Sequence, residues 1–254
     1  MSRSGLSACI ITYNEADRIE ACLDSVAFCD EIVVVDSHSS DATRELARRR
    51  GARVIERDWP GYRSQKQFAI ESAAHDWVLC LDADERLTPE LGASIRSALA
   101  ATPSAAAFAV ARRNRFLGRW LRHGEGYPDW IVRLFDRRRA RWSDTPVHES
   151  VVAHGPIVRL SGDLLHESAE SLEAYVAKQN RYTTLQASAM RERGEHASFA
   201  RLLLAPLVRF ARLYVVRLGF LDGAAGFAHI AIGCFASFLK YAKLRALREA
   251  DEQR

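Results

Sequence analysis

The chain has 254 residues, of which 48% are hydrophobic and 27% charged, a composition that excludes a disordered protein and fits one sizeable α/β domain with additions. Its formal net charge is +4, with arginines clustered at 112–122, 133–141 and 201–217, so we expect an anionic surface or ligand as partner and no nucleic acid. The five cysteines lack CxxC spacing, which predicts a reducing compartment, and the polar start of the chain predicts no signal peptide.

Short apolar runs alternate with stretches of helical spacing in the first third of the chain. The apolar runs predict buried strands at 6–12, 31–36, 53–56 and 77–82. The stretches between them predict helices at 16–28, 42–50 and within 61–74. This alternation is typical of a parallel, doubly wound sheet with right-handed crossovers. GxGxxG and GxxxxGK[ST] motifs are missing from the sequence, which argues against a dinucleotide-dependent dehydrogenase and against a P-loop NTPase.

Acidic side chains follow three of these strands, at the edge where open α/β sheets bind their ligands. Asn14-Glu15 follow the first strand, Asp36 the second, and Asp82 and Asp84 the fourth. Two residues apart in an extended segment, Asp82 and Asp84 can point the same way. Paired carboxylates suit a Mg²⁺ or Mn²⁺ ion that also holds a diphosphate. A lone DxD is more often a solvated turn before a helix, here one opened by Thr88-Pro89-Glu90.

Three segments together resemble the family-2 glycosyltransferases of GT-A fold: IITYNE at 10–15, VVVDSHSSDAT at 33–43 and WVLCLDADE at 77–85. The resemblance extends over roughly residues 6–100 in order, spacing and strand placement. It implies a metal-dependent enzyme whose first loop and second-strand acid hold a nucleotide, usually uridine. The implied roles are as follows: Thr12, Asn14 and Glu15 line the base pocket, Asp36 meets base or ribose, Asp82 and Asp84 hold metal and diphosphate, and Lys66 lies near ribose or phosphate. An exposed helix lysine is an equally good interpretation of Lys66.

Residues 101–170 are expected to form the acceptor side, with strands at 105–111 and 131–136. In the resembled family, a carboxylate about this far beyond the DxD acts as general base. Glu149 fits that place best, and Asp129 is its rival. His166 matches a downstream histidine that completes the metal or diphosphate site in many GT-A enzymes, although a partly buried structural histidine explains it equally well.

The proposed chemistry requires these groups. An inverting transfer is one in-line displacement at the anomeric carbon, with a transition state that resembles an oxocarbenium ion. A carboxylate takes the proton of the attacking hydroxyl. A divalent cation offsets the charge of the leaving diphosphate. Asp82 and Asp84 are too close together on one strand end to flank a sugar ring as the two carboxylates of a hydrolase do.

The sequence from residue 171 onward is different in character. A helix is predicted at 171–193, followed by a basic amphipathic segment at 198–218 that is typical of a membrane interface. Its arginines at 201, 209, 212 and 217 are expected opposite Leu203, Leu207, Phe210 and Leu213. Residues 219–239 approach the length of a bilayer span, but Asp222 and the glycines favour a shallow or re-entrant hairpin. A helical pair packed on the catalytic domain or at a dimer interface is the alternative.

Within the family, the Tyr-Asn-Glu loop at 13–15, the Arg-Leu-Phe and Val-His-Glu segments at 133–135 and 147–149, and the basic apolar tail resemble the bacterial lipopolysaccharide-core glucosyltransferases. This likeness extends over nearly the whole chain. It implies UDP-glucose as donor, a lipid-linked inner-core glycan as acceptor, and a peripheral or monotopic position on the cytoplasmic side of the inner membrane, whose anionic surface suits the basic tail. The expected domains are 1–170, a GT-A catalytic domain with a nucleotide-binding half (1–100) and an acceptor half (101–170), and 171–254, a helical region.

Other functions remain open at this point. The chain could use another sugar or a polyprenyl-phosphate acceptor, or be a catalytically silent nucleotide-sugar-binding protein. A metal-dependent nucleotidyltransferase is less favoured, because it needs a basic glycine-rich loop after the first strand, where Thr12-Tyr13-Asn14-Glu15 stands. A homo-oligomer is compatible with the sequence.

Overall fold

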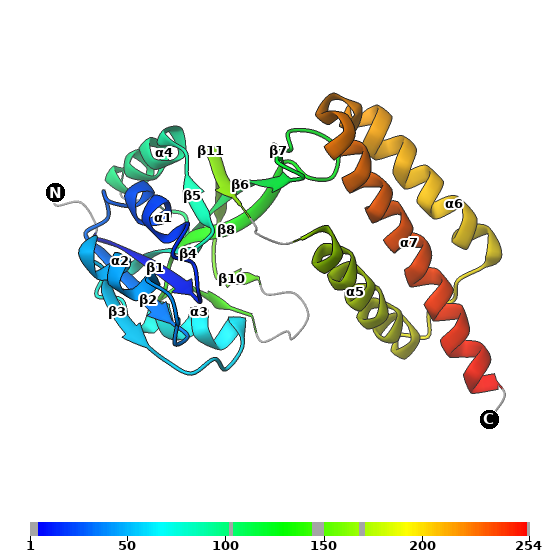
Figure 1. Cartoon of the computed structure of the whole chain (residues 1–254), viewed down its shortest axis with the longest axis horizontal. Helices are drawn as coiled ribbons and strands as arrows, with labels where there is room; N and C mark the ends of the chain where they lie inside the picture. Colours follow the sequence, from blue (N-terminus) through cyan, green and yellow to red (C-terminus); the bar gives the residue numbers. More distant parts are fainter. Residues whose placement is uncertain (1–4, 102–103, 144–149, 168–170, 253–254) are drawn as a thin grey trace. The chain divides into compact units, whose positions relative to one another are not determined.

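A computed structural model describes residues 5–101, 104–143, 150–167 and 171–252, and divides the chain into two compact units (Figure 1). The first unit comprises Met1–Arg113 with Asp129–Glu167, and the second comprises Asn114–Pro128 with Ser168–Arg254. Residues 114–128, which the sequence analysis assigned to the acceptor half, therefore pack within the second, helical unit.

The first unit is built on a mixed sheet whose strand order is β3-β2-β1-β4-β8-β6-β11-β5. Its strands are β1 (Leu6–Thr12), β2 (Glu31–Asp36), β3 (Arg53–Glu56), β4 (Trp77–Asp82), β5 (Glu85–Leu87), β6 (Ala107–Phe116), β8 (Asp129–Asp136) and β11 (Ile157–His166). The four predicted parallel strands are confirmed. Beyond β4, β8 runs antiparallel to both β4 and β6, so the sheet is not parallel throughout. Residues 117–128 join β6 to β8 without a helix, and antiparallel strands do not require a crossover helix.

Helices cover both faces of this sheet. They are α1 (Ile19–Ser25), α2 (Thr43–Arg49), α3 (Tyr62–Glu71) and α4 (Pro89–Ala100). Alternate residues of β1 enter different cores: Ala8 and Ile10 pack with α1 and α4, whereas Cys9 and Ile11 pack with α3. Both faces of β1 are therefore buried, which explains why four successive residues, Ala8 to Ile11, are apolar.

Local signals in the sequence set the start of α4. Thr88 is its N-cap, accepting a hydrogen bond from the backbone N–H of Leu91 at 3.3 Å, and Pro89 occupies the first helical position. The predicted opening of this helix by Thr88-Pro89-Glu90 is thus confirmed. A separate two-stranded ribbon pairs β9 (Ala140–Trp142) with β10 (Val151–Ala153).

The second unit is helical. It contains β7 (Arg119–Trp120), which pairs with the end of β6, and five helical elements: α5 (Leu172–Glu192), α6 (Phe199–Phe210), the π-helical turn η1 (Ala211–Val216), the 3₁₀ turn η2 (Gly219–Asp222) and α7 (Gly223–Glu252). In Figure 1, α7 lies between α5 and α6, and it packs against both. Tyr241 and Leu244 of α7 meet Ala187 and Met190 of α5 in one apolar cluster.

The expected hairpin within 219–239 is wrong, because α7 is one continuous helix and the chain reverses earlier, at 211–222. Gly219 allows this reversal to pack closely: a Cβ there would lie 2.3 Å from the Ile230 side chain and 2.8 Å from the Leu213 carbonyl oxygen. The predicted apolar face of 198–218 is also divided in two. Leu213 is buried, while Leu203 and Leu207 are exposed.

Asp222 fastens residues 114–128 to the helices. Its carboxylate is 2% exposed and accepts hydrogen bonds from the backbone N–H groups of Arg122 (2.9 Å) and His123 (2.8 Å). The His123 ring nitrogen Nδ1 lies 3.2 Å from its other oxygen. A buried carboxylate satisfied in this way is a structural anchor, and this explains a charge in an otherwise apolar stretch.

Candidate active site

The loops after β1 and β2 are joined by hydrogen bonds. The Asn14 backbone N–H donates to Ser39 Oγ, the Ser40 N–H to Asn14 Oδ1, and the Glu15 N–H to Thr43 Oγ1, each at 2.8 Å. Asn14 has φ +52°, a left-handed conformation that asparagine tolerates well. Strand register places Thr12 beside Asp36 and Ile11 beside Asp82. The structure therefore brings the predicted acidic strand ends to one edge of the sheet.

Asp36 is buried and holds its own loop. Its carboxylate accepts hydrogen bonds from the backbone N–H and the hydroxyl of Ser39, at 2.8 and 2.5 Å. In the described part of the chain, the buried hydroxyl of neighbouring Thr12 has no hydrogen-bond partner. The predicted contact of Asp36 with base or ribose stays a prediction. In the structure, Asp36 positions Ser39, whose hydroxyl accepts the backbone N–H of Asn14.

Asp82 ends β4 between two cations. Lys66 Nζ lies 2.9 Å from its Oδ1, and Arg133 Nη2 lies 3.1 Å from its Oδ2. Burial acts to raise the pKa of Asp82, but the Lys66 ammonium and the Arg133 guanidinium overcome this effect and hold the pKa well below its ordinary value. Asp82 is thus an ionised carboxylate, and Lys66 is not the freely exposed helix lysine of the alternative interpretation.

The sequence analysis did not identify three residues of this cluster: Glu85, Arg133 and Trp142. The Glu85 side chain is fully buried (0% exposed); its Oε1 lies 2.7 Å from Arg133 Nη2, and its Oε2 accepts the Asp82 backbone N–H at 3.1 Å. The buried Trp142 ring lies 5.1 Å from Lys66 Nζ and 5.9 Å from Arg133 Cζ. A charged residue at an inward position of the apolar run 131–136 was the available signal for Arg133.

Asp84 pairs with His166. Their Oδ2 and Nε2 atoms are 3.1 Å apart, and antiparallel pairing of β11 with β5 places His166 beside Glu85. The expectation that Asp82 and Asp84 share a face of one strand is wrong, because β4 ends at Asp82 and Asp84 lies in the turn to β5. Glu15 is close enough to Asp84 to be affected by its charge. Burial raises the pKa of Glu15, Arg18 opposes this effect, and the negative charge of Asp84 adds to it.

Of the two candidate bases, Asp129 has a defined ion-pair partner, Arg112. Asp129 accepts two hydrogen bonds on one oxygen, Oδ2, from Arg112 Nε (2.9 Å) and Nη2 (2.7 Å). Glu149 lies in 144–149, outside the described residues. The choice of Glu149 over Asp129 therefore stays a prediction.

The carboxylates of Asp82 and Asp84 match a hard divalent cation in kind, since carboxylate oxygens suit Mn²⁺ or Mg²⁺. Among the described residues, no three His, Cys, Asp or Glu side chains are arranged to hold a metal ion. Asp84 and His166 meet directly, while the carboxylate of Asp82 faces Lys66 and Arg133. The two carboxylates therefore fit the expected metal by donor chemistry, and binding it would require Asp82 and Asp84 to exchange these contacts for the ion.

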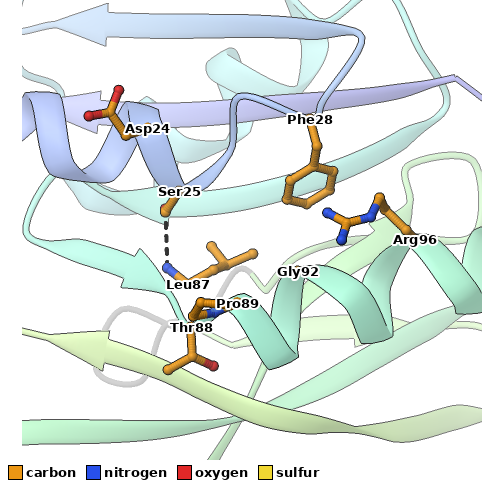
Figure 2. Close-up of a pocket in the computed structure, with 8 residues that line it drawn as sticks. All are labelled: Asp24, Ser25, Phe28, Leu87, Thr88, Pro89, Gly92 and Arg96. Carbon is orange, nitrogen blue, oxygen red and sulfur yellow. Dashed lines mark hydrogen bonds between the residues drawn. The ribbon is translucent and has the colours of Figure 1, made fainter.

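A pocket of about 350 Å³ lies elsewhere on the first unit, between α1 and α4 (Figure 2). In it the Arg96 guanidinium lies 5.0 Å from the centre of the Phe28 ring, and Ser25 Oγ accepts the backbone N–H of Leu87 at 3.1 Å. None of the predicted site residues that the structure describes, which excludes Glu149, lines this pocket.

Comparison with known proteins gives three results. The profile of the family described as "Glycosyl transferase family 2" matches residues 7–155. The chain is 34% identical to the lipopolysaccharide core biosynthesis glycosyltransferase LpsC of Rhizobium meliloti (strain 1021), over 94% of this chain and 91% of that protein. It is also 34% identical to the uncharacterized glycosyltransferase RP128 of Rickettsia prowazekii (strain Madrid E), over 95% of this chain and 87% of that protein.

Among solved structures, the chain is similar to the mannosyltransferase PcManGT of Pyrobaculum calidifontis, solved in complex with GDP-Man and Mn²⁺. The TM-score is 0.53, and the match covers 100% of this chain and 89% of that one. At 18% sequence identity, this similarity bears on the fold alone, which is that of the GT-A glycosyltransferases.

Proposed function

Because the chain belongs to glycosyl transferase family 2, we propose that it is an inverting glycosyltransferase of lipopolysaccharide core assembly that transfers glucose from UDP-glucose to an inner-core acceptor. Its GT-A fold and glycosyltransferase activity come with the family. The donor, the acceptor and the inverted stereochemistry are the proposed part. The relation to LpsC, a lipopolysaccharide core biosynthesis glycosyltransferase, supports the choice of acceptor.

One observation carries the assignment of the donor site: charged groups of both signs gather at the ends of β1, β4 and β11. An ionised Asp82 between Lys66 and Arg133 lies at the strand end that precedes the turn carrying the Asp84–His166 pair. A nucleoside diphosphate is itself polyanionic, so cations held beside the carboxylates can exchange partners with it when it binds.

Each group of this chain has a proposed task. The loops after β1 and β2 hold the nucleoside, with the Thr12 hydroxyl and the Ser39 hydroxyl as polar contacts. Lys66 and Arg133 bind the diphosphate and keep Asp82 ionised. Asp82, Asp84 and His166 would hold a Mn²⁺ or Mg²⁺ ion, whose charge offsets that of the leaving diphosphate.

The acceptor hydroxyl needs a base, and we assign that task to Glu149. Asp129 is less suited, because Arg112 already donates two hydrogen bonds to one of its oxygens and holds that carboxylate in an ion pair. Proton transfer to Glu149 as the hydroxyl attacks, with inversion at the anomeric carbon, completes one displacement. The acceptor is lipid-linked, so we place the enzyme on the anionic cytoplasmic surface of the inner membrane, in contact through its helical unit.

The test is a transfer assay with UDP-glucose, UDP-galactose and GDP-mannose, each offered an inner-core lipid A acceptor or a polyprenyl phosphate, with Mn²⁺ or with a chelator. We expect transfer from UDP-glucose to the inner-core acceptor that the chelator abolishes. Transfer to polyprenyl phosphate alone would contradict the proposed acceptor. Nucleotide binding without turnover, unchanged by Glu149→Gln, would show a catalytically silent protein.

A further inference from the structure

Helix α6 leaves an apolar stripe without a partner in the described part of the chain. None of its residues is buried, and Leu207 and Val208 are each 65% exposed. The exposed residues follow helical spacing along one side: Phe199, Leu203, Leu204, Leu207 and Val208. The opposite side meets α7, where Leu202 and Ala205 pack near Tyr241 and Leu244. The stripe therefore faces away from the core of the helical unit.

The stripe continues into the turn that joins α6 to α7. Val215 and Val216 of η1 are exposed, Val216 to 75%, and so are Phe220 and Leu221 of η2. Leu117, at the turn between β6 and β7, is exposed as well. Arg119, which follows this turn, donates from Nη2 to the Leu221 carbonyl oxygen at 3.0 Å, and this bond holds the turn beside η2. In Figure 1 the β7 turn and the start of α7 lie together at one end of the unit.

The exposed charges of this surface have one sign, because the Glu125 carboxylate is half-buried and paired with Arg209 of α6. Asp222 is the only carboxylate in the sequence between Glu195 and Glu249, and it is buried against Arg122 and His123. Arg119, Arg122, Arg212 and Arg217 are exposed. An exposed apolar stripe flanked by cations, without an exposed carboxylate in this segment, complements an apolar layer covered by phosphate groups.

Hydropathy alone selects a different element. Gly219–Glu249, which is mostly α7, is long and apolar enough to cross a membrane, and 39% of its most apolar stretch is buried within the structure. Ile230 and Cys234 are buried against Leu213, and α5 and α6 pack on α7. To cross a bilayer, α7 would have to lose those neighbours.

We propose that α6, η1, the η2 turn carrying Phe220 and the β6–β7 turn carrying Leu117 lie in the plane of an anionic bilayer. The α6 stripe then lies among the acyl chains, and α7 stays in the protein as its packing core. This inference refines the membrane contact included in the proposed function. It concerns binding to lipid and can be measured without any sugar transfer.

The first experiment is flotation of the whole protein with vesicles of phosphatidylcholine, with and without phosphatidylglycerol. The test variant is Leu204→Gln/Leu207→Gln/Val216→Gln, and the matched control is Leu172→Gln/Val176→Gln/Leu185→Gln on exposed apolar positions of α5. We expect the partition coefficient of the test variant to fall about tenfold or more and that of the control to change less than about twofold. Arg212→Gln should lower binding only to the anionic vesicles. Equal losses in both triple variants, or no loss in the first, would overturn the proposal.

The second experiment measures depth with spin labels introduced by Leu207→Cys or Phe235→Cys, after subtraction of the signal from labelled native protein. Phe235 is an exposed residue of α7. We expect the label at 207 to lie among the acyl chains and the label at 235 to stay in water. A deep label at 235 would mean that α7 spans the bilayer. A lipid-free dimer that the triple α6 variant disperses, with vesicle binding unchanged, would assign the stripe to a second copy of the chain.

Transfer to a delipidated inner-core oligosaccharide separates the two proposals. The α6 variant should keep its rate in that assay while failing to float. If instead the native protein floats as expected but transfers no sugar, the proposed function fails and the membrane surface stands.

Discussion

The two units of this protein differ in which residues they bury and expose against the usual pattern. The α/β unit buries charged groups and pairs each of them: Glu85 with Arg133, and Asp82 with Lys66. The helical unit exposes apolar groups along α6 and buries its anchor Asp222. Buried charges need partners of opposite sign, and exposed apolar stripes need cover. The first unit is thus prepared for a small polyanionic ligand and the second for an extended surface.

The largest expected effect is on catalysis in the first unit. Replacing both carboxylates, by Asp82→Asn with Asp84→Asn, should lower the rate of sugar transfer by about a thousandfold or more, because the leaving diphosphate loses its charge compensation. Asp24→Asn on α1, whose partner is Arg50, is the matched control and should keep full activity. Initial rates with UDP-glucose measure both. A double variant as active as the control would remove the basis for the donor site.

The next effect is on the stability of the same unit. Glu85→Gln leaves Arg133 with less compensation in a buried position, and we expect it to lower the free energy of unfolding by about 3–5 kcal/mol. Glu45→Gln breaks an exposed pair with Arg49, one helical turn away, and should cost about 0.5 kcal/mol or less. Urea unfolding followed by circular dichroism compares them. Similar midpoints for the two variants would show that the buried pair contributes little.

A smaller effect is expected in the helical unit. Asp222→Ala removes the acceptor of two backbone N–H groups and of His123, at a cost of about 3 kcal/mol in that unit. The two units need not unfold together, so hydrogen exchange is the suitable measurement. Exchange at the amides of Arg122 and His123 should accelerate, with strand β1 unaffected. Unchanged protection at those two amides would show that another contact holds the segment.

The smallest effect depends on pH. Burial acts to raise the pKa of Glu31, but the N–H of Ala74 and the hydroxyl of Ser7 reverse this effect and lower the pKa. A carboxyl with a lowered pKa in the folded state stabilises the protein above its unfolded pKa, and the contribution disappears as pH falls through the folded value. Glu31→Gln should therefore reduce stability by about 1 kcal/mol at pH 7 and by progressively less below about pH 4. Urea midpoints of the native protein and the variant, measured at pH 7 and below about pH 4, test this. A difference in midpoint that is the same at both pH values would contradict it.

The sequence was sufficient for features that depend on neighbouring residues. The four parallel strands, the start of α4 at Thr88 and the acidic strand ends follow from period, caps and the position of Asp82. It was insufficient where a partner lies far along the chain. Arg133 meets Asp82 across 51 positions and Asp222 meets Arg122 across 100, and periodicity carries no information about such pairs.

The glycines of α7 were misleading for a related reason. They suggested a hairpin because glycine weakens an isolated helix. In the structure, a Cβ at Gly226 would lie 2.5 Å from the Gly219 carbonyl oxygen, so its small size serves packing. Whether a glycine interrupts a helix or allows close packing depends here on the position of the turn at 219–222, which the sequence does not give.

The course of residues 114–128 has a practical consequence. The chain passes between the two units three times, near residues 113, 128 and 167. A single protease cut at any one of these places leaves two covalent links, so nicking alone would not free the helical part. Removing everything after residue 170 would also remove Ile230, which packs on Gly124, and Asp222, which binds the backbone of Arg122 and His123. The helical unit is therefore not a detachable appendage, and truncation is a poor way to ask what it does.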